Sequence, residues 1–260
     1  PRDGDRGRNV GFLTMLERLN LEYQMNPDEI VQQATELSAI ISKKLSSPDS
    51  SYISVKEALN KAQKQAIAEF DQRNGGRKGR PKFPSSFPLD VLCSKAWQED
   101  EEAKRMLYTT LVKMARGGLY DQLGGGFHRY SVDEYWSVPH FEKMLYDNAL
   151  LIPLYLHAGR LFQDEELLNI ANETSEYLLR ELQHRDGGFF SATDADSVTP
   201  KGEKEEGYYF TWTEEELSEI LTEEQYDLIL KEYGVTKRGN LEGRNTLVRQ
   251  NRDFSLEQIL

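Results

Sequence analysis

The stretch GGGFHRYSVDEYWSVPHFEKMLYDNALL, from Gly124 to Leu151, joins a glycine-rich loop to an apolar helical pattern. It places two histidines, several carboxylates and a series of large aromatic side chains in one loop and one helix start. Such a concentration of ionisable and aromatic groups beside three consecutive glycines has two interpretations. The stretch is either an ordinary loop-to-helix junction or the wall of a binding cavity, and the rest of the chain bears on the choice.

The pattern of a helix end, glycines and an aromatic or polar loop recurs along the chain. It is present in AEFDQRNGGRKGRPKFPS, MARGGLYDQLGGGFHRYS, RELQHRDGGFFSATDADS and, more faintly, KEYGVTKRGNLEGRNTL. The glycine centres lie near residues 75, 125, 187 and 240, and a period of this size indicates a repeated supersecondary unit, here a helical hairpin. Because the loops are long and recur at one end of each hairpin, we predict an all-α toroid with the loops at one mouth, rather than an open solenoid.

Helical periodicity dominates between the loops, and we expect roughly eight helices. In PDEIVQQATELSAIISKKLS, residues 27–46, apolar residues recur at a spacing close to 3.6, and proline followed by two acidic residues suits a first turn. In the central stretch a helix starting at Ser137 or Pro139 would place His140, Lys143 and Asp147 on one face. The best strand candidate is GYYFTW, residues 207–212, with GGFFSA, residues 187–192, as a possible partner.

Composition excludes several classes of protein. A net charge of −12, with RNGGRKGRPK as the only basic stretch, argues against a nucleic-acid partner. No apolar run approaches the ~20 residues of a membrane helix, so we expect no membrane contact and a cytoplasmic protein. The single cysteine, Cys93, rules out an intramolecular disulfide and a zinc site of several thiolates, and we expect it to be a buried small side chain. We expect neither a metal nor a cofactor.

The residues after the glycines are candidates for ligand binding. Phe127, Tyr130, Tyr135 and Trp136 can stack on flat or sugar-like rings, while Arg129 can bond to hydroxyls or carboxylates. The loop is neither a dinucleotide fingerprint nor a P-loop, because no βα unit surrounds it and no Lys-Ser or Lys-Thr follows. The alternative is that the aromatic rings only cover the top of the core.

The ionisable residues are candidates for proton transfer. Histidine titrates near neutrality, which makes His128 and His140 candidate acid–base groups, with Asp147 beside them. Asp194 and Asp196, in GGFFSATDADS, are candidate acceptors for sugar hydroxyls or one half of a carboxylate pair. The spacing of these two aspartates does not continue as a calcium loop. The alternative is a buried polar network that serves folding only.

Several of these motifs together resemble the family of thioredoxin-domain-containing proteins related to spermatogenesis-associated protein 20. The motifs are GGLYDQLGGGFHRYSVDEYWSVPHFEKMLYDNALL, PKFP, GGFFSATDADS, EEGYYFTWTEEEL and GNLEGRNTL, and the resemblance extends from about residue 10 to the end. It implies a thioredoxin-like domain followed by an (α/α)6 barrel similar to N-acylglucosamine 2-epimerases and six-hairpin glycosidases. The chain, 1–260, would then be a single helical domain, the N-terminal two-thirds or so of that barrel. The thioredoxin-like domain and its CxxC centre are absent, and a longer polypeptide is expected.

Two functions follow from this interpretation. The first is a carbohydrate-active barrel that binds a sugar-like ligand at its mouth, either epimerase-like with histidine acid–base chemistry or glycosidase-like with two carboxylates. The second is a non-catalytic ligand- or protein-binding module that works with the thioredoxin-like domain. The candidate catalytic residues are His128, His140 and Asp147, and the candidate substrate-binding residues are Arg129, Tyr130, Trp136, Lys143, Asp194 and Asp196.

Overall fold

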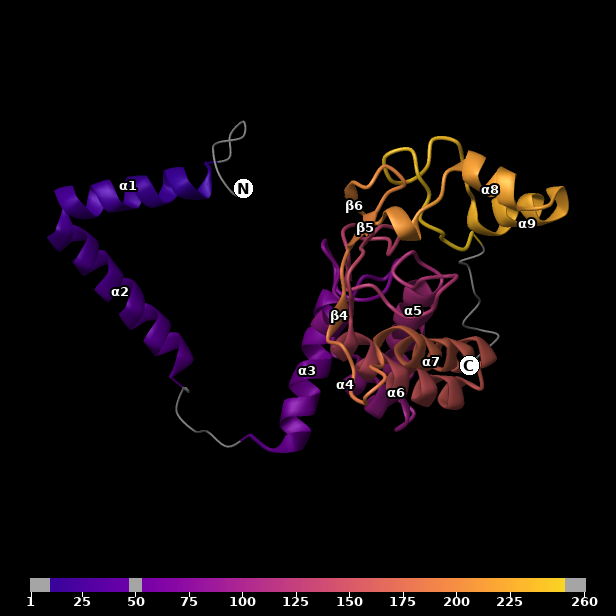
Figure 1. Cartoon of the computed structure of the whole chain (residues 1–260). Helices are drawn as coiled ribbons and strands as arrows, with labels where there is room; N and C mark the ends of the chain where they lie inside the picture. Colours follow the sequence, from indigo (N-terminus) through magenta and orange to yellow (C-terminus); the bar gives the residue numbers. More distant parts are fainter. Residues whose placement is uncertain (1–9, 47–52, 251–260) are drawn as a thin grey trace. The chain divides into compact units, whose positions relative to one another are not determined.

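The computed structural model describes residues 10–46 and 53–250 (Figure 1). Contacts divide the chain into two compact units, residues 1–54 and 55–260. The first unit contains α1 (Phe12–Met25) and α2 (Pro27–Leu45), and α2 begins at Pro27 with two acidic residues in its first turn, as expected. No residue of either helix is buried. The expectation of one domain over 1–260 stays a prediction.

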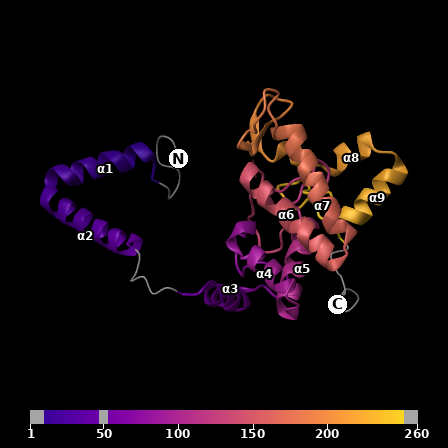
Figure 2. The ribbon, with the colours of Figure 1, turned by 90° about the horizontal axis from the view of Figure 1, so that it is seen from below.

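The second unit is mainly helical, with short β-hairpins in its loops, as predicted. The longer helices form consecutive hairpins, and Figure 2 shows α6 and α7 side by side. The helices are α3 (Val55–Glu69), α4 (Leu89–Ala96), α5 (Glu101–Ala115), α6 (Leu145–Phe162), α7 (Glu165–Tyr177), α8 (Glu214–Ile220) and α9 (Glu223–Tyr233). Short helical turns are η1 (Pro84–Ser86), the π-helical η2 (Leu178–Leu182) and η3 (Tyr208–Phe210). No helix among the described residues is long and apolar enough to cross a membrane.

The main core of this unit lies between α3, α4, α5, α6 and α7. Phe70, Leu92, Met106 and Tyr155 are fully buried there. Cys93 lies on α4 and is buried in the same cluster, as expected for a small apolar side chain. Burial of these side chains against their neighbours supplies most of the driving force for packing the hairpins.

In the described part of the chain, six short strands form three antiparallel pairs in the loops. They are β1 (Tyr130–Ser131) with β2 (Pro139–His140), β3 (Lys143–Met144) with β4 (Ala192–Thr193), and β5 (Asp196–Val198) with β6 (Lys204–Glu206). The expected helix start at Ser137 or Pro139 is therefore wrong, because residues 139–140 pair with β1 of the same loop, residues 143–144 pair with β4, and α6 begins only at Leu145. The expected strand over residues 207–212 is also wrong, because Gly207 adopts a φ of 73° and leads into the helical turn η3.

The glycine-rich turns have the same backbone in three successive repeats. In residues 71–76 and 121–126 the aspartate N–H donates to the last glycine carbonyl, and the preceding glycine N–H donates back to the aspartate carbonyl. Residues 184–188 repeat both bonds with His184 in place of the aspartate. The last two glycines of each turn have φ values between 67° and 90°, a region that favours glycine. The sequence repeat is therefore a structural repeat.

Each loop also pairs with the loop of the next hairpin. Lys82 pairs with Ser131, Lys143 pairs with Thr193, and Trp212 pairs with Asn245. The first two pairings join residues about fifty positions apart in the sequence, and Trp212 and Asn245 are 33 positions apart. These pairings place the glycine-rich loops of successive hairpins next to one another, as the toroid prediction requires.

Candidate functional site

A cavity of about 980 Å³ lies among the loops of the second unit. One wall is the loop that contains residues 118–124, and another is formed by the end of α7 and by η2. The opposite wall contains β5, η3, the start of α8 and residues 244–247. Six Tyr, Phe and Trp side chains line it among the described residues, namely Tyr120, Tyr177, Tyr208, Tyr209, Phe210 and Trp212.

His128 lies in this lining and is 1% exposed. Its Nδ1 lies 3.0 Å from the carbonyl oxygen of Phe141. Because a carbonyl only accepts, Nδ1 carries the proton and donates it, so Nε2 holds the lone pair. The ring packs edge-on against Phe141 and Phe210, at centroid distances of 5.3 Å and 4.8 Å. Burial and the nearby charge of Lys143 lower the pKa of His128 to about 3, so the imidazole is neutral at pH 7.

Lys143 also lines the cavity and is 1% exposed. Its ammonium group donates to Asp121 Oδ2 at 2.7 Å and to the Gly125 carbonyl at 2.8 Å. It lies over the rings of Tyr177 and Phe210, 4.4 Å and 4.9 Å from their centroids. Burial acts to raise the pKa of Asp121, but the charge of Lys143 and the hydrogen bonds from the Gly124 N–H and Lys143 together outweigh it and hold this pKa below its usual value. Burial lowers the pKa of Lys143, and the charge and hydrogen bond of Asp121 oppose that effect. The contacts hold the pair in one geometry.

The previous repeat contains the same ion pair outside the cavity lining. Lys82 is 1% exposed, and it donates to Asp71 Oδ2 at 2.6 Å and to the Gly75 carbonyl at 2.8 Å. Its ammonium group lies 5.3 Å from the ring centroid of Trp136. Because Lys82 makes the same contacts outside the lining of this cavity, we interpret both pairs as scaffold that fixes the glycine-rich turns.

Asp194 and Asp196 lie at the exposed edge of the cavity. Both are in its lining, and Asp196 is the first residue of β5. Asp194 lies 3.8 Å from the ammonium group of Lys204, and both side chains are 66% exposed. An ion pair this exposed is weak, which leaves the carboxylate oxygens available to a ligand.

His140 lies outside the lining of this cavity. Its Nδ1 is 2.6 Å from Glu206 Oε1, and its Nε2 is 3.3 Å from Glu142 Oε2. The ring stacks on Tyr130, which is likewise outside the lining, at a centroid distance of 5.0 Å. Arg129 donates to Glu142 at 2.7 Å in the same network. This network connects β1, β2 and β6. Both ring nitrogens of His140 lie next to carboxylates, those of Glu206 and Glu142.

Asp147 and Trp136 are buried away from the lining. Asp147 is 4% exposed in the first turn of α6, and burial raises its pKa to about 6 against the opposing charge of Arg129. Trp136 is 1% exposed, and its indole N–H donates to the Asn74 carbonyl at 2.9 Å. The structure thus brings His128, Lys143, Asp194 and Asp196 to one cavity, and it leaves the other predicted site residues outside. Their predicted roles in binding or catalysis stay predictions.

Sequence reasoning missed several lining residues, notably Arg180, Arg244 and Thr246. Arg244 is held by Glu216, with Nη2 to Oε2 at 2.8 Å, and by Thr211, with Nε to Oγ1 at 2.8 Å. Thr246 is 5% exposed, and its hydroxyl has no hydrogen-bond partner in the described part of the chain. Arg244 and Thr246 lie in GNLEGRNTL, the faintest copy of the repeat, and the position of that copy was the available signal.

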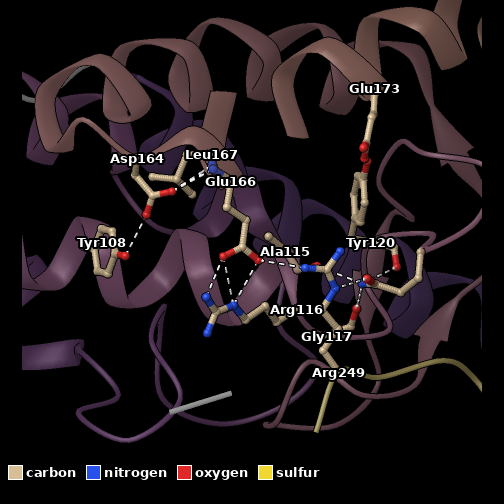
Figure 3. Close-up of polar contacts among 11 residues, drawn as sticks. Tyr108, Ala115, Arg116, Gly117, Tyr120, Asp164, Glu166, Leu167, Glu173 and Arg249 are labelled. Carbon is tan, nitrogen blue, oxygen red and sulfur yellow. Dashed lines mark hydrogen bonds and ion pairs between the residues drawn. The ribbon is translucent and has the colours of Figure 1, made fainter. Parts of the chain in front are cut away.

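A second polar cluster contacts the loop that contains residues 118–124, which forms one wall of the cavity (Figure 3). Arg116, at the end of α5, donates to Glu166 of α7 through Nε at 3.0 Å and Nη2 at 2.5 Å. Arg249 donates to the same carboxylate at 3.1 Å, and Tyr120 donates to Glu173 at 2.5 Å. These bonds connect α5, α7 and residue 249 to the loop that carries the cavity wall. We interpret them as structural.

No group of three or more His, Cys, Asp or Glu side chains in residues 10–46 and 53–250 is placed to hold a metal ion.

Comparison with known proteins gives relatives along most of the chain. No family model matches it. It is 36% identical over 259 residues to spermatogenesis-associated protein 20 of Homo sapiens and 35% identical to that of Mus musculus. It is 32% identical over 256 residues to an uncharacterized protein of Caenorhabditis elegans. Each alignment covers 93% of this chain but only 33%, 32% and 35% of those relatives, so the chain spans about a third of their length.

Among solved structures, cellobiose 2-epimerase from Spirochaeta thermophila is similar with a TM-score of 0.42 and 19% identity. The similarity covers 60% of this chain and 45% of that one.

Proposed function

Because the chain is a homologue of spermatogenesis-associated protein 20 over 93% of its residues, we propose that it is a carbohydrate-binding part of this family, taking a sugar-like ligand beside His128. The observation that carries the proposal is the cavity lining. A volume of about 980 Å³ lies at the upper end of the range for small-molecule sites. Aromatic rings next to hydroxyls, carboxylates and a neutral imidazole suit the apolar faces and hydroxyl edges of a sugar.

The chemistry best supported is epimerase-like proton transfer. The Phe141 carbonyl fixes the proton on Nδ1 of His128, which leaves Nε2 as the acceptor for a proton from a sugar carbon next to a carbonyl. Burial and Lys143 disfavour the resulting imidazolium, so the proton is readily returned to carbon. A glycosidase-like reaction has less support, because Asp147 is outside the lining and the two loop aspartates lie at one exposed edge.

The alternative is a binding module without turnover. A pKa of about 3 makes His128 a weak base at pH 7, since the best acid–base groups titrate near the working pH. In that case His128 is a hydrogen-bond acceptor, and the module works with the thioredoxin-like domain that the family resemblance implies for the full-length protein.

The test measures binding and exchange together. The chain is titrated with a panel of free sugars by calorimetry, and bound sugars are incubated in D₂O to follow loss of carbon-bound protons by NMR. His128→Ala is expected to abolish exchange, whereas His140→Ala, a matched change outside the lining, keeps it. Binding without exchange in the unchanged chain supports the module. A panel in which no sugar binds would reject the proposed function.

A further inference from the structure

We infer that the ligand of this cavity is a sugar without a phosphate or carboxylate group, an inference that rests on the proposed function. The ionisable side chains of the lining carry the argument. Six carboxylates face three cations, which leaves the lining with a net charge of −3. The carboxylates are Asp121, Glu181, Asp194, Asp196, Glu216 and Glu219, and the cations are Lys143, Arg180 and Arg244.

Lys143 offers no free charge to a ligand. Its ammonium group donates to Asp121 and to the Gly125 carbonyl, and aromatic rings cover it. Lys82 makes the corresponding contacts in the preceding repeat, outside the lining of this cavity. The turn itself therefore accounts for the bonding of Lys143, and an anionic ligand would have to displace Asp121 to reach it.

The two arginines of the lining, Arg180 and Arg244, also donate hydrogen bonds to protein groups. Arg180 donates from Nε to Glu181 Oε1 at 2.8 Å and from Nη2 to the Gly124 carbonyl at 2.5 Å. Arg244 donates through all three of its nitrogens to Thr211 and Glu216, and its guanidinium lies 4.4 Å from the centroid of the Tyr208 ring. Bidentate recognition of phosphate or carboxylate needs a guanidinium edge that is free. The edge of Arg244 is occupied, whereas Arg180 is half exposed and is bonded among the described residues through Nε and Nη2, with the adjacent Glu181 offsetting its charge.

The lining groups left without protein partners are neutral or negative. Thr246 presents a buried hydroxyl that forms no hydrogen bond within the described part of the chain. His128 presents a neutral Nε2 to which no described residue donates. Asp196 and Glu219 lie in the lining without an ion pair to any described cation. All four groups can accept bonds from sugar hydroxyls, and the two carboxylates repel a phosphate or a carboxylate.

The experiment compares matched sugars that differ in one charged group. The chain is titrated by calorimetry with glucose, glucose 6-phosphate and glucuronate, and with mannose and N-acetylglucosamine beside their 6-phosphates. We expect at least one neutral sugar to bind, and its charged counterparts to bind at least tenfold more weakly. The double variant Asp194→Asn, Asp196→Asn is expected to reduce this ratio several-fold. Glu205→Gln, on β6 outside the lining, is expected to keep it.

The outcomes separate this inference from the proposed function. A phosphorylated or acidic sugar that binds as tightly as its neutral counterpart, or more tightly, overturns the inference and leaves the proposed function standing. A ratio unchanged in the double variant also contradicts it, because the carboxylates would then not be the cause. A panel in which nothing binds rejects the proposed function, and the inference fails with it.

Discussion

Replacing Lys82 with methionine tests whether the two buried lysines are scaffold. The change removes the cation from Asp71 and the donor from the Gly75 carbonyl, while the methionine keeps most of the apolar volume. Breaking a buried ion pair from one side costs about 3–5 kcal/mol. Asp71 retains two backbone donors, the N–H groups of Arg73 and Asn74, both at 3.0 Å. The expected loss therefore lies at the lower end, about 3 kcal/mol.

The same reasoning assigns a nearly equal loss to Lys143→Met. Its partner Asp121 also retains two backbone donors, from Leu123 at 3.1 Å and Gly124 at 2.9 Å. Two scaffold lysines with matching contacts should thus cost the same, within about 1 kcal/mol. If the role of Lys143 were to bind a ligand, replacing it would instead lower the free energy of unfolding only slightly.

Urea unfolding at pH 7 measures both losses by linear extrapolation. The three tryptophans, Trp97, Trp136 and Trp212, all lie in the second unit, so their fluorescence follows its unfolding. The double variant Asp71→Asn, Lys82→Met removes both charges and is expected to recover part of the loss. A loss under about 1 kcal/mol for Lys143→Met, beside about 3 kcal/mol for Lys82→Met, would refute the scaffold interpretation.

Three other predictions follow from the same contacts. His128 is expected to stay neutral from pH 5 to 8 and to keep its Nδ1 proton in ¹⁵N NMR spectra, because burial lowers its pKa to about 3; a transition inside that window would contradict the assigned environment. Burial raises the pKa of Asp147 to about 6, so its ionisation makes the native state less stable as pH rises from about 4 to 6. Asp147→Asn should therefore stabilise the protein by about 2 kcal/mol at pH 7 and hardly at all at pH 4 in urea unfolding, and an equal gain at both pH values would count against it. Thr213→Ala removes the capping box of α8 and should cost about 1 kcal/mol by the same measurement, whereas Ser218→Ala, later in that helix, should cost less.

Sequence periodicity predicted the parts of the fold that depend on local contacts. The proline and acidic residues that start α2 and the recurring glycine turns are all present. Each depends on residues within a few positions of one another, so its signal is complete in a short stretch of sequence. The mainly helical class followed from the same kind of signal.

The parts that sequence reasoning missed depend on partners far along the chain. Residues 139–147 have apolar and polar spacing that fits a helix, but Pro139 and His140 pair with β1, and Lys143 pairs with Thr193. The partner of Lys143 belongs to another loop, and β1 pairs with β2 across a turn within the same loop, so helical periodicity contains no trace of either pairing. The strand geometry then separates His140 and Asp147 from the cavity that contains His128. The sequence also did not indicate that residues 177–181 and 244–247 form walls of this cavity, because these segments lie far along the chain from residues 124–151.

The repeat also explains why one glycine turn carries the candidate site. The position two residues after the second glycine is Lys78 in the first repeat, His128 in the second and Phe190 in the third. The backbone of the turn is shared, but Lys78 and Phe190 are exposed, whereas His128 is enclosed by Phe141 and Phe210. Phe210 comes from η3, which follows the third repeat. Enclosure by a neighbouring loop, and not the turn itself, therefore makes the imidazole of His128 buried and neutral.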